Sequence, residues 1–273
     1  MLKSRISTAC SAVLLSLSIS GAEGSDFDIA SPFTPGSTWI VMLGGFGGAE
    51  PSFPGANTYA FAPRPILDIY RAGDRTWLTL PTDAFGFTLY SAGDFRFGAA
   101  GDYILDRSHR YDSVLRGLPD INYTWEAGVF AEYYPLPFLR TRFELLQGVS
   151  GADGLVANLI ADYIIAPDPA LLLTVGPRLY LANTQDQSAF FSISNADSAP
   201  SGLPAYHASG GLNSAGVAAT VRYNLNEQLS LRAFAEWDRL LDDAAESPIV
   251  KLRGSVDQYQ IGLGAAYRFT LSW

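Results

Sequence analysis

The chain offers few side chains for covalent catalysis. Its 273 residues include two histidines, His109 and His207, and a single cysteine, Cys10. His207 and Ser209 are two positions apart, so on a strand both side chains would lie on one face. A histidine beside a serine, with a third polar group to orient the imidazole, can activate the serine as a nucleophile. Asn183, on the strand expected to precede the pair, is the candidate for this third group.

The same two residues have a second interpretation, which we favour. Although the His-x-Ser spacing resembles that of outer-membrane phospholipase A and of lipid A deacylases, the pair ends a Ser- and Asn-rich loop at about 184–209. Gly210 and Gly211 follow and can break the strand register. On this interpretation His207 and Ser209 are polar loop residues, and His109 is a solvated loop residue. We therefore predict no catalytic residue, with a lipid hydrolase using His207 and Ser209 as the alternative.

Metal, cofactor and nucleic-acid sites are not indicated either. Asp242 and Asp243 are expected to be solvated loop charges rather than metal ligands. The glycine-rich run at 44–48 lacks the Gly-Lys-Ser/Thr ending of a phosphate loop. Without Lys3 and Arg5, which belong to a predicted signal peptide, 16 basic and 27 acidic residues give a net charge of −11, which argues against nucleic-acid binding. We predict no metal and no cofactor.

Charged residues instead recur at every second position along a series of apolar stretches. If these stretches are strands of a membrane barrel, the charged side chains share the face opposite the apolar one and point into the lumen. A misplaced arginine on a lipid-facing surface would cost roughly 2–4 kcal/mol at the membrane midplane, and a buried charge requires a partner. We therefore predict a barrel lumen crossed by ion pairs, which favours a narrow or plugged barrel, with a charge-selective channel as the alternative. The arginines at these positions are Arg96, Arg140, Arg142, Arg178, Arg222, Arg232 and Arg268. The carboxylates are Asp102, Glu126, Glu132, Glu144, Asp162, Glu236 and Asp238.

Strands must position these side chains, because the apolar residues alternate strictly with them. In 258–273 every odd position is apolar or aromatic, and the run exceeds the roughly 9–11 residues that a tilted strand needs to cross a membrane. After residue 22 no apolar run approaches the ~18 residues of a spanning helix, and a membrane protein without such helices must be a closed barrel. The weakest strands are predicted at 62–72, 75–82 and 84–91. We count about twelve strands, with ten as the lower count.

Short turns and long loops alternate between the predicted strands. Turns at 135–137, 166–169 and 224–227 are expected on one rim. Loops at 106–120, 184–209 and 241–254 are expected on the other rim. Since bacterial outer-membrane barrels have short periplasmic turns, an even strand count places both termini in the periplasm. The predicted fold is therefore an all-β, antiparallel, up-and-down transmembrane barrel, with a soluble β-sandwich or lipocalin-like barrel as the alternative.

Both ends of the chain carry targeting features. Residues 1–22 are predicted to be a cleaved signal peptide, with basic Lys3 and Arg5, an apolar core at 9–19 and a small-residue cleavage site. An N-terminal anchor is the alternative, but eleven apolar residues fall short of the ~20 that a spanning helix needs. Residues 23–37 are predicted to be a short periplasmic leader, and 38–273 the barrel. Alternate residues of the last strand form a predicted assembly signal for the barrel-assembly machinery: Tyr267, Phe269, Leu271 and Trp273.

The loops resemble those of the MltA-interacting protein (MipA/OmpV) family of Gram-negative outer membranes. Matching stretches occur at 115–121, at 190–194 with 201–203 and Tyr206, and most strongly before the last strand. The resemblance covers nearly the whole mature chain. Ser192 and Ile193 stand where the family usually has Gly-Val, and four residues extend beyond Phe269. The strongest matching positions are Asp243, Ala244, Ala245, Ser247 and Pro248.

This resemblance implies a non-enzymatic protein of the outer membrane. The family's namesake is a scaffold that joins a lytic transglycosylase to a penicillin-binding protein, and other members are linked to adhesion or antibiotic response. A scaffold or surface-interaction protein is therefore our leading hypothesis, a narrow small-solute channel the second and the lipid hydrolase the third. The expected partners are outer-membrane lipid, the barrel-assembly machinery, a lytic transglycosylase and a penicillin-binding protein.

Overall fold

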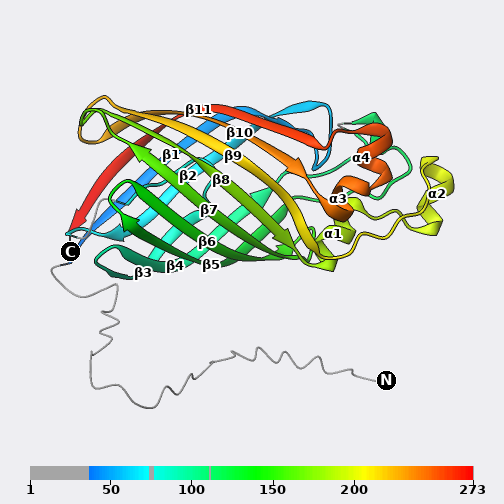
Figure 1. Cartoon of the computed structure of the whole chain (residues 1–273), viewed down its shortest axis with the longest axis horizontal. Helices are drawn as coiled ribbons and strands as arrows, with labels where there is room; N and C mark the ends of the chain where they lie inside the picture. Colours follow the sequence, from blue (N-terminus) through cyan, green and yellow to red (C-terminus); the bar gives the residue numbers. More distant parts are fainter. Residues whose placement is uncertain (1–36, 74–76, 111, 273) are drawn as a thin grey trace, which may run out of the picture. The chain divides into compact units, whose positions relative to one another are not determined.

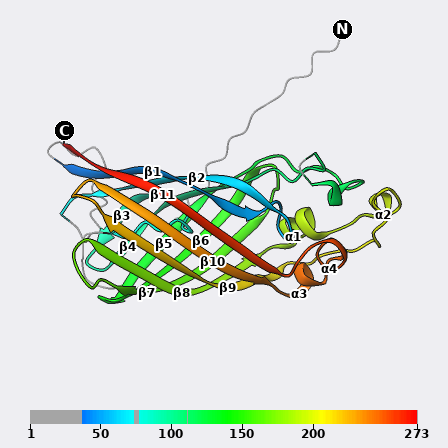
Figure 2. The same ribbon diagram turned by 90° about the horizontal axis from the view of Figure 1, so that it is seen from above.

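The wall of the molecule is a single closed sheet. The structure is a computed structural model that describes residues 37–73, 77–110 and 112–272. In these residues eleven strands form a barrel in the order β1-β11-β10-β9-β8-β7-β6-β5-β4-β3-β2 (Figures 1 and 2). The strands are β1 (Thr38–Pro51), β2 (Tyr59–Arg71), β3 (Phe85–Ala92), β4 (Phe95–Ile104), β5 (Thr124–Leu136), β6 (Leu139–Ser150), β7 (Leu155–Ile165), β8 (Leu171–Ala182), β9 (Gly211–Asn224), β10 (Leu229–Leu240) and β11 (Asp257–Ser272).

The first and last strands close the barrel. β1 and β11 pair antiparallel from Thr38 opposite Ser272 to Ala49 opposite Ile261. The closure pairs both edge strands and leaves no open edge. The two ends of the described barrel therefore lie at the same rim. The predicted all-β barrel is confirmed, whereas the predicted signal peptide, the leader up to residue 36 and Trp273 lie outside the described residues.

Short helices cluster at the rim opposite these ends (Figure 1). They are the 3-10 helix η1 (Ser113–Leu115), α1 (Thr184–Phe191), α2 (Asn195–Ser201), α3 (Asp242–Glu246) and α4 (Pro248–Arg253). We call this end the helical rim. The tight connections at 93–94, 137–138, 166–170 and 225–228 lie at the other end, the turn rim, so the predicted division of turns and loops between two rims is observed. None of the helices in the described ranges has the length and apolar character required to cross a membrane.

The strands present apolar side chains outward. On β11 the outward residues Tyr259, Ile261 and Leu263 are 51%, 58% and 71% exposed, while the inward Gln258 is buried. The same alternation runs through β5 to β10. A soluble monomer rarely exposes a continuous apolar surface of this size, whereas a lipid bilayer solvates it.

One predicted strand is not part of the wall. A weak strand is predicted at 75–82, but residues 77–84 lie inside the barrel instead. All of these residues are buried or half-buried, and they form no ladder with a neighbouring strand. The chain thus returns through the lumen, so β3 runs parallel to β2, with Asp68 opposite Gly86 and Ile69 opposite Phe87. The wall consequently has eleven strands rather than twelve, and the even-number argument for the termini does not apply.

Neighbouring strands approach one another closely at several glycines, and the approach is tightest at Gly128 and Gly176. A Cβ at Gly128 would lie 1.9 Å from the carbonyl oxygen of Leu145, and one at Gly176 would lie 1.8 Å from that of Ala161. Such distances are far inside van der Waals contact, and the clashing atoms belong to the backbone. A side chain at either position would therefore displace the adjacent strand.

We expect Gly128→Ala to destabilise the barrel by about 1–3 kcal/mol, as overpacking typically does. The shift should appear as a lower urea midpoint in detergent micelles, followed by tryptophan fluorescence. Gly45→Ala is the matched control, because its Cβ would lie at an ordinary 3.5 Å from the carbonyl oxygen of Arg64. Equal midpoints for the two variants would contradict the close strand approach at Gly128.

Candidate functional site: the barrel lumen

The lumen is crossed by residues 77–84, which we call the lumen segment. Its backbone is held by side chains of the wall rather than by a sheet ladder. Leu78 N donates to Tyr134 Oη at 3.2 Å, and Ala84 N donates to Glu144 Oε1 at 3.0 Å. Arg232 Nη1 donates to the carbonyl oxygen of Thr79 at 2.5 Å. Since buried backbone groups require partners, these inward polar side chains replace the missing strand neighbours.

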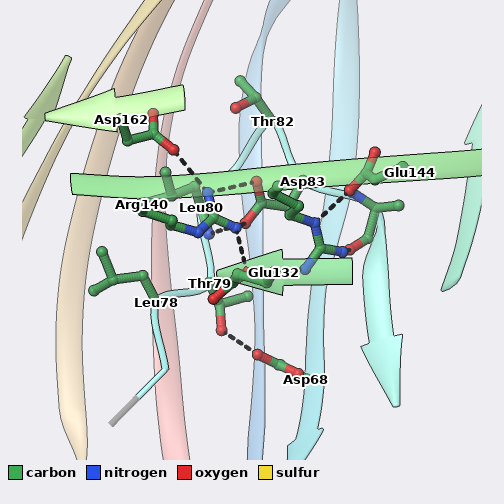
Figure 3. Close-up of polar contacts among 12 residues, drawn as sticks. Asp68, Leu78, Thr79, Leu80, Thr82, Asp83, Glu132, Arg140, Glu144 and Asp162 are labelled. Atoms are coloured by element: carbon green, nitrogen blue, oxygen red, sulfur yellow. Dashed lines mark hydrogen bonds and ion pairs between the residues drawn. The ribbon is translucent and has the colours of Figure 1, made fainter. Parts of the chain in front are cut away.

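An ion pair and a side-chain hydrogen bond fix the lumen segment against the wall (Figure 3). Asp83 of the segment accepts hydrogen bonds from Arg140 Nη1 and Nη2 at 3.2 and 2.6 Å. Thr79 Oγ1 donates to Asp68 Oδ2 at 2.7 Å. The segment is therefore tied to β2 and β6 by charged groups that have almost no access to solvent.

Glu132 lies at the centre of these charges. Its Oε2 atom accepts from Arg96 Nη2 at 3.1 Å, Arg140 Nη2 at 2.8 Å and Arg142 Nη1 at 3.2 Å. All four side chains are at most 2% exposed. A carboxylate shared by three guanidinium groups is the arrangement that allows so many charges to be buried together.

Further carboxylates complete this cluster. Arg140 also pairs with Asp162 at 2.7 Å, and Arg178 pairs with the same carboxylate at 2.8 Å. Four arginines and five carboxylates thus form one group, the central network. Its members are Asp68, Asp83, Arg96, Glu132, Arg140, Arg142, Glu144, Asp162 and Arg178.

Aromatic rings fill the space around the central network. The Arg96 guanidinium lies 5.0 Å from the ring centre of Trp77 and 5.1 Å from that of Phe130, while Arg142 lies 4.1 Å from the Phe130 ring. Trp77 and Phe130 are both fully buried. Cation–π contacts of this kind are stronger when water is excluded. The mid-section of the lumen is therefore packed with side chains.

The structure places the predicted lumen residues in three groups. Those in the central network are Arg96, Glu132, Arg140, Arg142, Glu144, Asp162 and Arg178. Arg222, Arg232 and Arg268 lie outside this network, and the ion pairs predicted for them are not found among the described residues. Arg232 donates to the carbonyl oxygen of Thr79, whereas the buried Nε atoms of Arg222 and Arg268 have no hydrogen-bond partner in the described part of the chain. Those lining a cavity nearer the helical rim are Asp102, Glu126, Glu236 and Asp238. Asp68 and Asp83 are network members that the sequence analysis missed. Asp68 belongs to a weakly alternating strand, and Asp83 follows the stretch misread as one.

A cavity of about 270 Å³ lies between the central network and the helical rim. We call it the acidic cavity. Arg64 is the one arginine among its described lining residues, and its Nη2 lies 2.7 Å from Glu50 Oε2. Burial raises the pKa of Asp186, in α1, to about 6. Its carboxylates are Glu50, Asp102, Glu126, Asp186, Glu236 and Asp238.

The helices of the helical rim form a packed cap over this cavity. Phe190 and Phe191 of α1 pack with Ala244 of α3 and Val250 of α4. Arg107 is buried beneath them, where its Nη1 donates to the carbonyl oxygen of Phe190 at 2.6 Å. The loops at this end thus have their own apolar core.

The loop that most strongly resembles the family contributes directly to the cap. Ser247 Oγ accepts from Ile249 N at 3.3 Å as the N-cap of α4 and donates to the carbonyl oxygen of Phe191 at 2.7 Å. Pro248 occupies the first turn of α4, where a missing N–H costs nothing. Ala244 and Ser247 are fully buried. These residues therefore build the cap rather than an exposed recognition motif.

The candidate catalytic residues do not assemble into a triad. His207 and Ser209 are exposed and precede β9, so they lie in a loop and not on a strand. The Asn183 side chain caps α1 by accepting from Asp186 N at 3.0 Å. Ser209 N donates to Asp243 Oδ2 at 2.7 Å, which ties the loop to α3. His109 contacts Asp120 at 3.0 Å on the surface, and this hydrogen bond lowers the pKa of Asp120.

Metal ligation finds no support in the described part of the chain, where no cluster of three or more histidine, cysteine or acidic side chains could hold an ion. The cavity carboxylates are therefore too dispersed to coordinate one metal together. Asp242 and Asp243, the pair considered in the sequence, belong to α3 in the cap.

The described members of the predicted assembly signal share the outer face of β11. Tyr267, Phe269 and Leu271 are each about two-fifths exposed, and the rings of Tyr267 and Phe269 lie 4.7 Å apart. Phe269 is opposite Val41 at the seam between β11 and β1. An outward aromatic surface at the turn rim is consistent with the interfacial belts of membrane barrels.

We expect deletion of 271–273 to reduce the yield of folded barrel less than the same deletion combined with Phe269→Asp. The deletion removes only the last pairs of the seam, whereas the charge also disrupts its lipid-facing surface. Folded protein would be measured in isolated outer membranes as the fraction with heat-modifiable electrophoretic mobility. Equal yields for the two variants would refute a special role for Phe269.

Comparison with solved structures returns membrane barrels at low similarity. NanC porin has a TM-score of 0.43 at 9% identity, with 82% of this chain and 98% of that chain covered. An outer-membrane channel from Pseudomonas putida F1 has a TM-score of 0.41 at 9% identity, with coverages of 91% and 100%. The N-terminal barrel domain of Pseudomonas aeruginosa OprF has a TM-score of 0.31 at 12% identity, with coverages of 86% and 98%. The fold assignment itself rests on the strand pairing described above.

Comparison at the level of sequence is more specific. No curated protein matches the chain. The family model described as MltA-interacting protein MipA, however, matches residues 43–269, from β1 to the end of the lipid-facing aromatics of β11. That range includes the lumen segment, the central network and the cap. The family match, together with the closed barrel, places the protein in the outer membrane. The chain belongs to the MltA-interacting protein MipA family.

Proposed function

We propose that this protein is a closed outer-membrane barrel that acts as a non-enzymatic scaffold or surface-interaction protein. The observation that carries the proposal is the dense packing of side chains in the lumen. The lumen segment and the central network fill the mid-section with buried ion pairs and rings, which disfavours a wide aqueous path. The separate apolar core of the cap supplies a firm surface at the helical rim.

The orientation we propose follows from the general asymmetry of bacterial barrels. Short turns are periplasmic and long loops extracellular. The turn rim, with both ends of the barrel, would then face the periplasm, and the cap would face outward. The family description names MltA, a lytic transglycosylase, so we propose a murein-degrading enzyme as periplasmic partner and a penicillin-binding protein as a further one.

Affinity capture from cross-linked cell envelopes tests the scaffold. We expect the tagged full-length protein to enrich a lytic transglycosylase. A barrel with its turns at 166–170 and 225–228 replaced by Gly/Ser residues should lose this enrichment, whereas replacement of 195–200 at the helical rim should retain it. Absence of any murein hydrolase or synthase from the wild-type capture would count against the proposal.

A narrow small-solute channel is the second candidate, favoured by the acidic cavity in the lumen. Such a channel would need a path past the central network. Stable open steps of the wild-type protein in planar bilayers would favour the channel, and a silent bilayer containing folded protein would favour the scaffold. We propose no catalytic role for His207 and Ser209, because the structure does not place them with Asn183 in a triad.

A further inference from the structure

The acidic cavity is lined by far more carboxyl groups than basic side chains. Six carboxylates and one arginine line it among the described residues. The arginine, Arg64, is bound to Glu50 and also donates to Gln260 Oε1 at 3.1 Å. No ion pair joins the other five carboxylates to a basic side chain anywhere in the described ranges. In the central network of the same lumen, by contrast, each carboxylate forms an ion pair with an arginine.

Four of these five carboxylates are buried, and Asp102 is half-buried. Asp238 is 6% exposed, and its Oδ1 atom has no hydrogen-bond partner in the described part of the protein. Glu126 and Asp186, from β5 and α1, are 7% and 6% exposed. An unpaired buried carboxylate is costly because it loses hydration without gaining a counter-charge. The Asp238 oxygen therefore marks a place where a donor from a ligand would be stabilising.

The remaining walls of the cavity indicate the kind of ligand. Phe190 and Phe191 of the cap and Ile104 of β4 form an apolar wall, whereas Glu236 and Asp238 form an acidic one. Glu236 Oε1 is already hydrogen-bonded by the Tyr180 hydroxyl at 2.6 Å, which orients its carboxylate. The carboxylates are not grouped for a metal ion, and a volume of about 270 Å³ is close to the lower limit of small-molecule pockets.

We propose that the acidic cavity is a binding site for a small organic cation, namely a linear aliphatic diamine or triamine. Its ammonium groups would donate charge-assisted hydrogen bonds to Glu126 and Asp238, and its methylene chain would contact the phenylalanines of the cap. The ammonium groups of such a ligand are separated along its chain, which suits carboxylates that come from three different elements, β5, β10 and α1. This site does not rest on the scaffold role, because it faces the interior of the barrel beneath the cap.

Isothermal titration of the folded full-length protein in detergent micelles tests this site. We expect 1,5-diaminopentane and spermidine to bind with dissociation constants at or below about 1 mM. The neutral isostere 1,5-pentanediol should not bind. Absence of binding by both amines would overturn the proposal, as would equal competition by magnesium chloride at the same concentration.

The double variant Glu126→Gln/Asp238→Asn should bind the diamine at least about tenfold more weakly, a loss of about 1.4 kcal/mol. Its control is Glu227→Gln/Asp168→Asn, which removes two exposed carboxylates at the turn rim and should leave binding unchanged. Heat-modifiable mobility reports folding of each variant. Should the double variant not fold, the two single variants provide the same comparison. Full affinity in a folded variant that lacks these carboxylates would refute the site.

Discussion

Replacement of Glu132 by glutamine is expected to destabilise the barrel by about 3–5 kcal/mol, the usual cost of removing one partner from a buried ion pair. The glutamine would nearly preserve the shape of the side chain but would leave Arg96, Arg140 and Arg142 around a neutral amide. Three of the four network arginines donate to the Glu132 carboxylate. The loss should appear in urea unfolding of the detergent-solubilised protein, followed by tryptophan fluorescence.

Asp257→Asn is the matched control for this experiment. Asp257 also pairs with an arginine, Arg239, at 2.9 Å, but the two side chains are 34% and 51% exposed. Exposed pairs contribute about 0–1 kcal/mol, because water screens the charges and already solvates them. If Glu132→Gln unfolded at the same urea concentration as Asp257→Asn, the central network would not be a stabilising feature.

Replacement of residues 78–83 by six Gly and Ser residues is expected to convert a silent barrel into a conducting one. The change removes Leu78, Leu80 and Asp83 from the lumen and frees Arg140 from its ion pair with Asp83. Water can then hydrate the arginines and enter the mid-section. Planar-bilayer recordings should show stable open steps for this variant and none for the wild type.

The control replaces residues 195–200, an equal length of chain in α2 at the helical rim, by Gly and Ser. This variant should remain silent, because α2 does not line the acidic cavity or contact the central network. Where the 78–83 variant does not fold, Leu78→Ala/Leu80→Ala removes the apolar contacts and keeps Asp83. If neither folded lumen variant produced open steps in planar bilayers, the role of the segment as a plug would be contradicted.

The sequence determined the class of the fold and which side chains point inward. Strict two-residue alternation assigns every second side chain to one surface, and lipid excludes charges such as Arg140 and Arg178 from the outer one. Position along the chain therefore decides which face a residue takes. The same local information identified the short turns and the long loops, and the loop before β11 indicated the family.

Tertiary structure alone decided what happens inside the barrel. The 75–82 stretch is predicted to be a strand of the wall, yet residues 77–84 lie in the lumen, because Arg232, Glu144 and Tyr134 from distant strands satisfy their backbone groups. Sequence spacing cannot show such contacts, which depend on strand register and on the closure between β1 and β11. Because spacing does not show which lumen charges are neighbours, the sequence predicted ion pairs among all the lumen arginines and carboxylates. The structure instead separates a paired network, with Asp68 and Asp83, from a cavity whose carboxylates form no ion pair with a described basic side chain, apart from Glu50 with Arg64.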